Sequence, residues 1–205
     1  SSTNYWGLGL PNPELIQLFG DGDIRRETTM SFEGDTSWIE IAGGKRYTPS
    51  FSHSVTKTYQ KKWECSAEEY IDHSAEWMHA PSNIKLIRYS DVYLMAAEAA
   101  LMLGDNAKAL AYVNKVRERA RMCGTSGLPA ALTSVSLNDI ILERRLEFAG
   151  EGHRMFDIVR WNIAADLIKQ TYDGTPIEYV RGKHEFQPLP QREVDLSEGK
   201  LVQYP

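Results

Sequence analysis

Residues 87–120 read IRYSDVYLMAAEAALMLGDNAKALAYVNKVRERA. In the first half, apolar residues recur at the spacing of one helix face, at Val92, Met95, Ala96, Ala99 and Leu103. Gly104 is a stop signal, and Asp105 or Asn106 can cap a second helix. The same spacing returns at Ala109, Val113, Val116 and Ala120. Because the connection is so short, the stretch predicts two antiparallel helices that form a hairpin.

A second helical hairpin is predicted after the Gly/Pro/Ser/Thr-rich stretch 124–134. Ser136 and Asp139 have the spacing of a capping box. The third helix has its apolar face at Ile141, Leu142, Leu146, Phe148 and Ala149. Beyond residues 150–152, a fourth helix follows the phase of Phe156, Val159, Ile163 and Leu167, and we expect it to pack back on the third.

Residues 94–118 resemble one tetratricopeptide unit, with small residues in the first helix and Gly104-Asp105 at the turn. Such units bury their faces by stacking, and at least about three are usually needed. We therefore expect partner helices from elsewhere in a parent protein.

The flanking parts are less regular. Residues 1–82 are broken by prolines and contain a turn at 20–23, with a small hairpin permitted around Gly43-Gly44. Prolines return after Thr171, which predicts an irregular tail. The predicted fold is mainly α, with tetratricopeptide-like helical hairpins packed against an irregular, loop-rich segment with at most a small β-hairpin. We expect one domain over 1–205, made of a loop-rich, ligand-facing part (1–82), the helical hairpins (83–170) and the tail (171–205).

Composition narrows the function. The 205 residues carry a net charge of -5 with acidic and basic residues interspersed, so nucleic acid is not an expected partner. No run approaches the roughly 20 apolar residues of a membrane helix. Cys65 and Cys123 fit no metal spacing, and two separate thiols are favoured over a single bridge. The five histidines form no short ligand motif, so we expect neither a metal nor a cofactor.

Three segments carry a family resemblance. IRYSDVYLMAAEA at 87–99, followed by NKVRERA at 114–120, is similar to IRYADVLLMYAEA and IN-x-VR-x-RA of the RagB/SusD family. ILERRLEFAGEGHRMFDIVRW at 141–161 resembles ER-x-x-EL-x-x-EG-x-R-x-x-DLRRW, and FQPLPQREVDLSEGKLVQYP at 186–205 resembles the family's closing segment. A weaker match, LPNPELIQLFGDGDIRRETT at 10–29, shares an Asp-x-Arg-Arg element.

The resemblance implies a binding lipoprotein on the extracellular face of a bacterial outer membrane. Such a protein captures glycans or peptides and delivers them to a SusC-like TonB-dependent transporter. Family members are usually more than twice this long, so the resemblance also implies an N-terminal half, with the lipid anchor, as a further partner. A helical adaptor for protein partners is an alternative, and a hydrolase would need a convergent carboxylate pair that no spacing here singles out.

Two sets of side chains are candidates for a role. Charged residues with alternating signs at i,i+3 and i,i+4 suit an ion-pair network that locks the third and fourth helices, and we expect no catalytic residue among them. The predicted structural set joins these charged residues to the other residues of the family signature. It consists of Arg88, Asp91, Glu98, Glu143, Arg144, Glu147, Glu151, Arg154, Asp157, Arg160 and Trp161. Ligand contact is predicted at Trp6, Trp38 and Tyr47, because aromatic rings beside turns and polar neighbours can stack on sugar rings. Trp161, within a helix, is expected in the core.

Overall fold

The computed structural model describes residues 10–33, 40–41, 45–46, 54, 56–62, 83, 85–172 and 175–203. The chain divides into two compact units, Ser1–Glu151 and Gly152–Pro205. Within the described residues, no helix is both long enough and apolar enough to cross a membrane.

The first unit begins with two short helices, α1 (Pro13–Leu18) and α2 (Ile24–Thr29). Asn12 caps α1 by accepting a hydrogen bond from the Glu14 N–H, and Asp23 caps α2 in the same way through Arg25. Strand β1 (Met30–Phe32) follows and pairs antiparallel with β4 (Thr58–Gln60). Phe19, Met30, Leu146 and Ala149 form a buried cluster that ties this region to the helices.

The predicted hairpin around Gly43-Gly44 is present. β2 (Glu40–Ile41) pairs antiparallel with β3 (Lys45–Arg46), with Glu40 opposite Arg46. The described residues also contain two strand pairs beyond the predicted one, β1–β4 in this unit and one in the second unit. The mainly helical class is confirmed.

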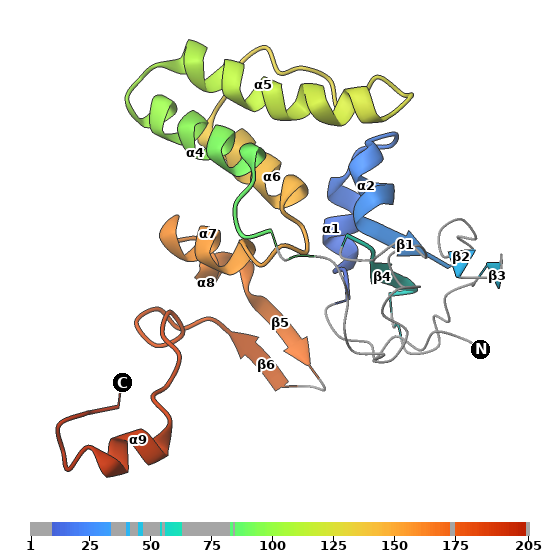
Figure 1. The fold of residues 1–205 in the computed structure, drawn as a ribbon. Helices are drawn as coiled ribbons and strands as arrows, with labels where there is room; N and C mark the ends of the chain where they lie inside the picture. The colour runs from blue at the N-terminus through green and yellow to red at the C-terminus, as the bar shows by residue number, and fades with distance from the viewer. Residues whose placement is uncertain are drawn as a thin grey trace. The chain divides into compact units, whose positions relative to one another are not determined.

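Three longer helices form the main body of the first unit: α4 (Tyr89–Met102), α5 (Asn106–Cys123) and α6 (Leu137–Glu147). Figure 1 shows α4 and α5 as the predicted antiparallel hairpin, with α6 beside α4. Asp105 caps α5 by accepting from the Lys108 N–H. The predicted capping box opens α6, because the Ser136 and Asp139 side chains each accept a backbone N–H of the other residue.

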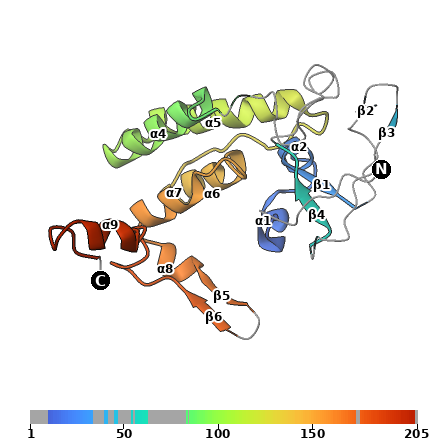
Figure 2. The same cartoon turned by 60° about the horizontal axis from the view of Figure 1, so that its bottom comes forward.

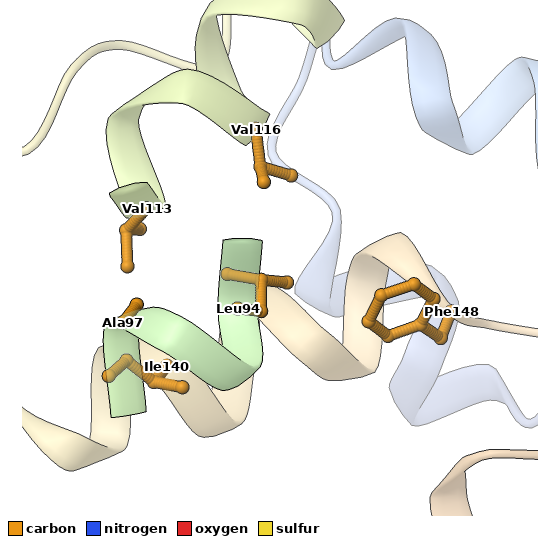
Figure 3. Packing of buried hydrophobic residues seen from close by; sticks show 6 residues of the cluster. All are labelled: Leu94, Ala97, Val113, Val116, Ile140 and Phe148. Carbon is orange, nitrogen blue, oxygen red and sulfur yellow. The ribbon is translucent and has the colours of Figure 1, made fainter. Parts of the chain in front are cut away.

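The core of these helices is a cluster of six buried residues, drawn in Figure 3: Leu94, Ala97, Val113, Val116, Ile140 and Phe148. The predicted face of α5 is confirmed, since all four of its residues are buried. On α6 the buried aliphatic residue of the first turns is Ile140, while Leu142 is exposed. The predicted face was therefore displaced by one or two residues at this end of α6.

The predicted face of α4 is wrong. Val92 and Met95 are each 46% exposed and Leu103 is 86% exposed, whereas Leu94 and Ala97 are fully buried. The reason is that α4 is apolar almost all round, so its periodicity fits two faces. The face with Leu94 packs on α5 and α6, and the described residues leave the predicted face exposed.

The second unit contains α7 (Arg154–Arg160), α8 (Ala164–Leu167), β5 (Lys169–Tyr172), β6 (Thr175–Glu178) and α9 (Gln191–Leu196). The predicted fourth helix is thus broken in two, at Asn162, which has a φ of 58°. Within the described residues its predicted apolar face is only partly covered, because Phe156 is 77% and Leu167 44% exposed while Val159 and Ile163 are partly buried. The tail is also more regular than predicted, because β5 and β6 form a hairpin (Figure 2) and α9 follows.

Candidate functional site

The three residues predicted to contact ligand, Trp6, Trp38 and Tyr47, lie outside the described residues, so their role stays a prediction. Two other features bear on function. The first unit contains a buried network of ion pairs, and the second unit contains a small pocket.

The network is centred on two carboxylates of α6, Glu143 and Glu147, which are only 1% and 2% exposed. They lie four residues apart and so share one helix face. Arg25 bridges them, with its Nη1 2.5 Å from Glu143 Oε1 and 3.2 Å from Glu147 Oε2. Arg25 is itself held by Asp23, the cap of α2, at 2.7 Å. The cap of a short helix therefore also orients the central cation.

Further arginines reach both carboxylates. Arg117 of α5 lies 2.6 Å from Glu143, and Arg119, also of α5, lies 3.3 Å from Glu147. Arg88, directly before α4, lies 2.5 Å from Glu147 Oε1. A buried carboxylate is costly unless it is paired and hydrogen-bonded, and here each has cations from at least two elements.

Arg88 extends the network beyond the end of α6, to Glu151. It binds Glu151 with two parallel hydrogen bonds of 2.8 Å, a geometry that the planar guanidinium favours. Lys62 also pairs with Glu151 and donates to the Glu147 carbonyl at 2.5 Å. The ring of Phe148 packs against Arg88 at 4.6 Å and against Arg144 at 4.9 Å. The aromatic ring is thus flanked by two cations.

A separate buried pair joins α6 to α4, where Arg144 Nη1 donates to Asp91 Oδ1 at 2.8 Å. Both residues are at most 5% exposed. Arg144 thus connects α6 to α4 through Asp91.

Neighbouring cations determine the protonation of Glu147 and Glu151. Burial alone would raise the pKa of Glu147, but the charges and hydrogen bonds of Arg88 and Arg25 outweigh it and lower that pKa to about 2. The pKa of Glu151 is also lowered despite burial, because Arg88 and Lys62 donate to its carboxylate. Burial lowers the pKa of Lys62. A general acid needs a carboxyl whose pKa is raised, so these two carboxylates are unsuited to that role.

The network differs from the predicted one in its partners. We expected pairs at helical spacing that lock the third and fourth helices. Glu143 and Glu147 instead take their cations from α2, α5 and the residue before α4. Arg25, Lys62, Arg117 and Arg119 were missed as members, although Arg25 lies in the weak Asp-x-Arg-Arg match and the two α5 arginines lie in NKVRERA.

The remaining signature residues are placed as follows. Asp157 and Arg160 form the i,i+3 pair on α7, with Nη2 and Oδ1 3.0 Å apart. Trp161, expected in the core, is only partly buried, and the Arg160 guanidinium lies 4.2 Å from its ring centre. Glu98 and Arg154 are partly buried, on α4 and at the start of α7. Among the described residues, no group of three His, Cys, Asp or Glu side chains could hold a metal ion.

The pocket in the second unit has a volume of about 210 Å³. Its lining comes from the α7–α8 corner and from the segment after β6. The polar and aromatic groups that face it are Asn162, Tyr179, Arg181 and Glu185. The sequence gives no signal for this pocket, because Asn162 lies 17 positions before Tyr179 and none of these four residues belongs to a recognised motif.

The sequence profile of the SusD family matches residues 11–205, nearly the whole chain. The chain belongs to the SusD family. A SusD-like protein from Bacteroides ovatus is 39% identical over 165 residues, which is 77% of this chain and 28% of the relative. SusD-like protein P25 from Formosa agariphila is 36% identical over 62% of this chain, and the match spans 24% of the relative. This SusD-family chain therefore spans about a quarter of the length of these relatives.

Solved structures agree with the family. Surface glycan-binding protein A from Bacteroides thetaiotaomicron aligns with 94% of the SusD-family chain and 40% of its own length, with a TM-score of 0.73 and 26% identity. A second structure of that protein, with the same values, is a complex with laminarihexaose. The corresponding protein from Bacteroides fluxus has a TM-score of 0.69 at 23% identity, which supports the fold.

Proposed function

We propose that this chain is part of a non-catalytic extracellular protein that binds a glycan. Its membership of the SusD family carries the proposal. Its likeness to a surface glycan-binding protein that has been solved with laminarihexaose supports a glycan over other ligands. A peptide ligand within the same family, or a helical adaptor for protein partners, is the alternative.

The cellular role in this proposal is nutrient uptake. The parent protein is held by a lipid anchor on the extracellular face of the outer membrane and passes its ligand to a SusC-like TonB-dependent transporter. This part rests on the family resemblance. It predicts that the protein co-purifies with such a transporter from outer membranes, and recovery of the protein without any transporter would count against it.

The ligand contacts in this proposal are the rings of Trp6, Trp38 and Tyr47. Stacking a sugar ring on an aromatic face is expected to contribute about 1–3 kcal/mol, the scale of burying an aromatic side chain. Affinity gels containing laminarin, xylan, mannan or pectin identify the polysaccharide, and calorimetry with its oligosaccharide then gives the Kd. Replacement of each ring by alanine should weaken binding roughly 5- to 150-fold.

The matched control is Phe156→Ala, which removes an aromatic ring that is 77% exposed on α7. It should leave the Kd unchanged. If all three predicted rings can be replaced without loss of affinity, the ligand surface lies elsewhere. If instead a peptide library binds and no polysaccharide does, the peptide-binding alternative replaces the glycan.

The absence of catalysis is tested on the same ligands. Glu143, Glu147 and Glu151 each form an ion pair with an arginine, which supports a structural role for these three carboxylates. Incubation with the polysaccharide that binds should therefore release no reducing ends. Steady release that a single Asp or Glu substitution abolishes would show that the protein is a hydrolase.

We also propose that the uncovered face of α4 packs against the additional polypeptide that longer relatives possess. This face carries Tyr89, Val92, Met95, Met102 and Leu103, which are 46% to 86% exposed. A helix that is apolar all round is normally buried, and helical repeats need neighbours on both sides. The longer relatives contain additional polypeptide that could cover this face, because the matches to this chain span only 24–28% of their length.

The test uses the region of the Bacteroides ovatus relative that this chain does not match, produced as a separate polypeptide. Mixing it with the chain should form a complex and slow hydrogen exchange in α4. Met95→Glu should weaken the complex at least tenfold, since it places a charge in an apolar contact. Lys115→Glu, at an exposed position of α5, should not. Absence of any complex, or equal weakening by both variants, would remove the proposal.

A further inference from the structure

The pocket of the second unit is built from two walls that are each held by their own hydrogen bonds. One wall is the corner between α7 and α8. There the Asn162 N–H donates to the Val159 carbonyl and the Ile163 N–H donates to the Ile158 carbonyl, both at 2.9 Å. These bonds fix the corner at Asn162, and Ala164 and Ala165 follow it as small apolar lining residues.

The other wall is the turn 179–185. The Val180 N–H donates to His184 Nδ1 at 2.9 Å, and the Val180 carbonyl accepts from the Lys183 and His184 N–H groups at 3.2 and 3.1 Å. The Gly182 N–H donates to Glu185 Oε2 at 2.6 Å, and Gly182 has a φ of 84°, which favours glycine. Both walls are thus ordered before any ligand enters, which lowers the entropic cost of binding.

The polar groups of the pocket differ in charge and in hydrogen-bonding role. The Arg181 guanidinium attracts Glu185 electrostatically, but neither it nor the Asn162 side chain forms a hydrogen bond or a salt bridge with the described residues. Glu185 accepts a backbone N–H, which lowers its pKa and keeps it ionised near neutral pH. Tyr179 lies beside Glu185, and burial together with that carboxylate raises the pKa of the Tyr179 hydroxyl, which therefore keeps its proton.

This combination selects a class of ligand. Glu185 would repel a simple anion and Arg181 would repel a simple cation, so neither kind of ion suits the pocket. A neutral ring with several hydroxyls can accept from Arg181 and Asn162, donate to Glu185, and place its C–H groups against Tyr179 and the alanines. The volume of about 210 Å³ lies below the roughly 300–1,000 Å³ of pockets for drug-sized ligands. One monosaccharide unit is of that size.

We infer that this pocket binds a single sugar unit, separately from the aromatic loop residues of the proposed glycan site. The choice of a sugar as ligand rests on the proposed function, whereas the position of the site rests on the geometry of the pocket. A second contact on one glycan would raise the apparent affinity for long chains over short ones, because the second contact forms at high effective concentration.

The experiment uses the alanine methyl groups of the pocket as reporters. With ¹³C-methyl alanine labelling, titration of the chain with glucose should shift the Ala164 and Ala165 signals in a saturable way. Arg181→Ala should raise the Kd for this effect at least fivefold. Lys183→Ala removes a cation from the same turn that does not line the pocket, and it should leave the Kd unchanged.

The outcomes separate this inference from the proposed function. Polysaccharide binding on affinity gels without any glucose-dependent shift at Ala164 and Ala165 overturns the pocket and leaves the glycan proposal standing. Saturable shifts without any polysaccharide binding support the pocket and remove the larger proposal. Tighter binding of glycine than of glucose would identify a zwitterion site, and an equal response in Arg181→Ala would show that the shifts arise elsewhere.

Discussion

Glutamine at position 147 should destabilise the chain by about 3 kcal/mol at neutral pH. Glu147 is 2% exposed and lies 2.5 Å from Arg88 and 3.2 Å from Arg25. Glutamine keeps the shape of the side chain but removes its charge, so the buried Arg25 and the partly buried Arg88 each lose an ionic partner. Removal of one member of a buried pair costs about 3–5 kcal/mol. Arg25 keeps Asp23 and Glu143, which places the expected loss at the lower end.

The pKa gives an independent value. Glu147 is lowered from 4.5 to about 2 in the folded chain, and each pKa unit corresponds to about 1.4 kcal/mol, so its ionised form contributes about 3 kcal/mol. Because the folded pKa is depressed, the unfolded chain takes up this proton first as the pH falls. The contribution is complete above pH 4.5 and is lost progressively down to about pH 2. Glu147→Gln has no such contribution at any pH.

Urea unfolding followed by circular dichroism at 222 nm measures both effects. The difference in unfolding free energy between the wild type and Glu147→Gln should be about 3 kcal/mol at pH 7 and should shrink towards zero near pH 2. Glu118→Gln is the control, because Glu118 is 48% exposed in its pair with Lys115 and such a pair contributes at most about 1 kcal/mol. Equal stability of Glu147→Gln and wild type at pH 7, or a difference that does not change with pH, would refute the reasoning.

Three further changes test the fold. Gly150→Ala should lower the free energy of unfolding in urea by about 2–3 kcal/mol, because Gly150 has a φ of 79° and an added Cβ would clash with Gln60. Gly104→Ala is the control: Gly104 has a φ of 80° but open space around it, so the loss should be only about 1 kcal/mol. Ser136→Ala removes the capping box of α6 and should lower stability by about 1 kcal/mol, whereas an unchanged urea midpoint would show that the cap is dispensable. Asp91→Ala should cost about 3 kcal/mol, and adding Arg144→Met should recover part of it; strictly additive losses would contradict their coupling.

The sequence predicted best those features that depend on near neighbours. The caps at Asp105 and Ser136 need only residues within three positions, and both form. The apolar face of α5 was also predicted correctly, because charged residues occupy its other side and leave one choice. On α4 the pattern fits two faces, and only the packing of α5 and α6 decides that Leu94 is inside and Met95 outside.

The sequence predicted that these charged residues form ion pairs, but it did not predict which residues pair with which. Helical spacing suggested partners three or four residues away. The partners of Glu143 and Glu147 are instead Arg25, at separations of 118 and 122 residues, and Arg88, 59 residues from Glu147. No periodicity can reveal pairs this distant. The predicted ligand contacts lie outside the described residues and remain predictions.

The network gives a physical reason why several segments together carry the family resemblance. The segment 87–99 supplies Arg88 and Asp91, the segment 114–120 supplies Arg117, and the segment 141–161 supplies the carboxylates and Arg144 that pair with them. Removing one partner of a buried pair costs about 3–5 kcal/mol, so a change in one segment is less destabilising when its partner in another segment changes as well. Because Arg88 lowers the pKa of both Glu147 and Glu151 and pairs with each of them, we expect this network to stabilise the helices of the first unit rather than to contact a ligand.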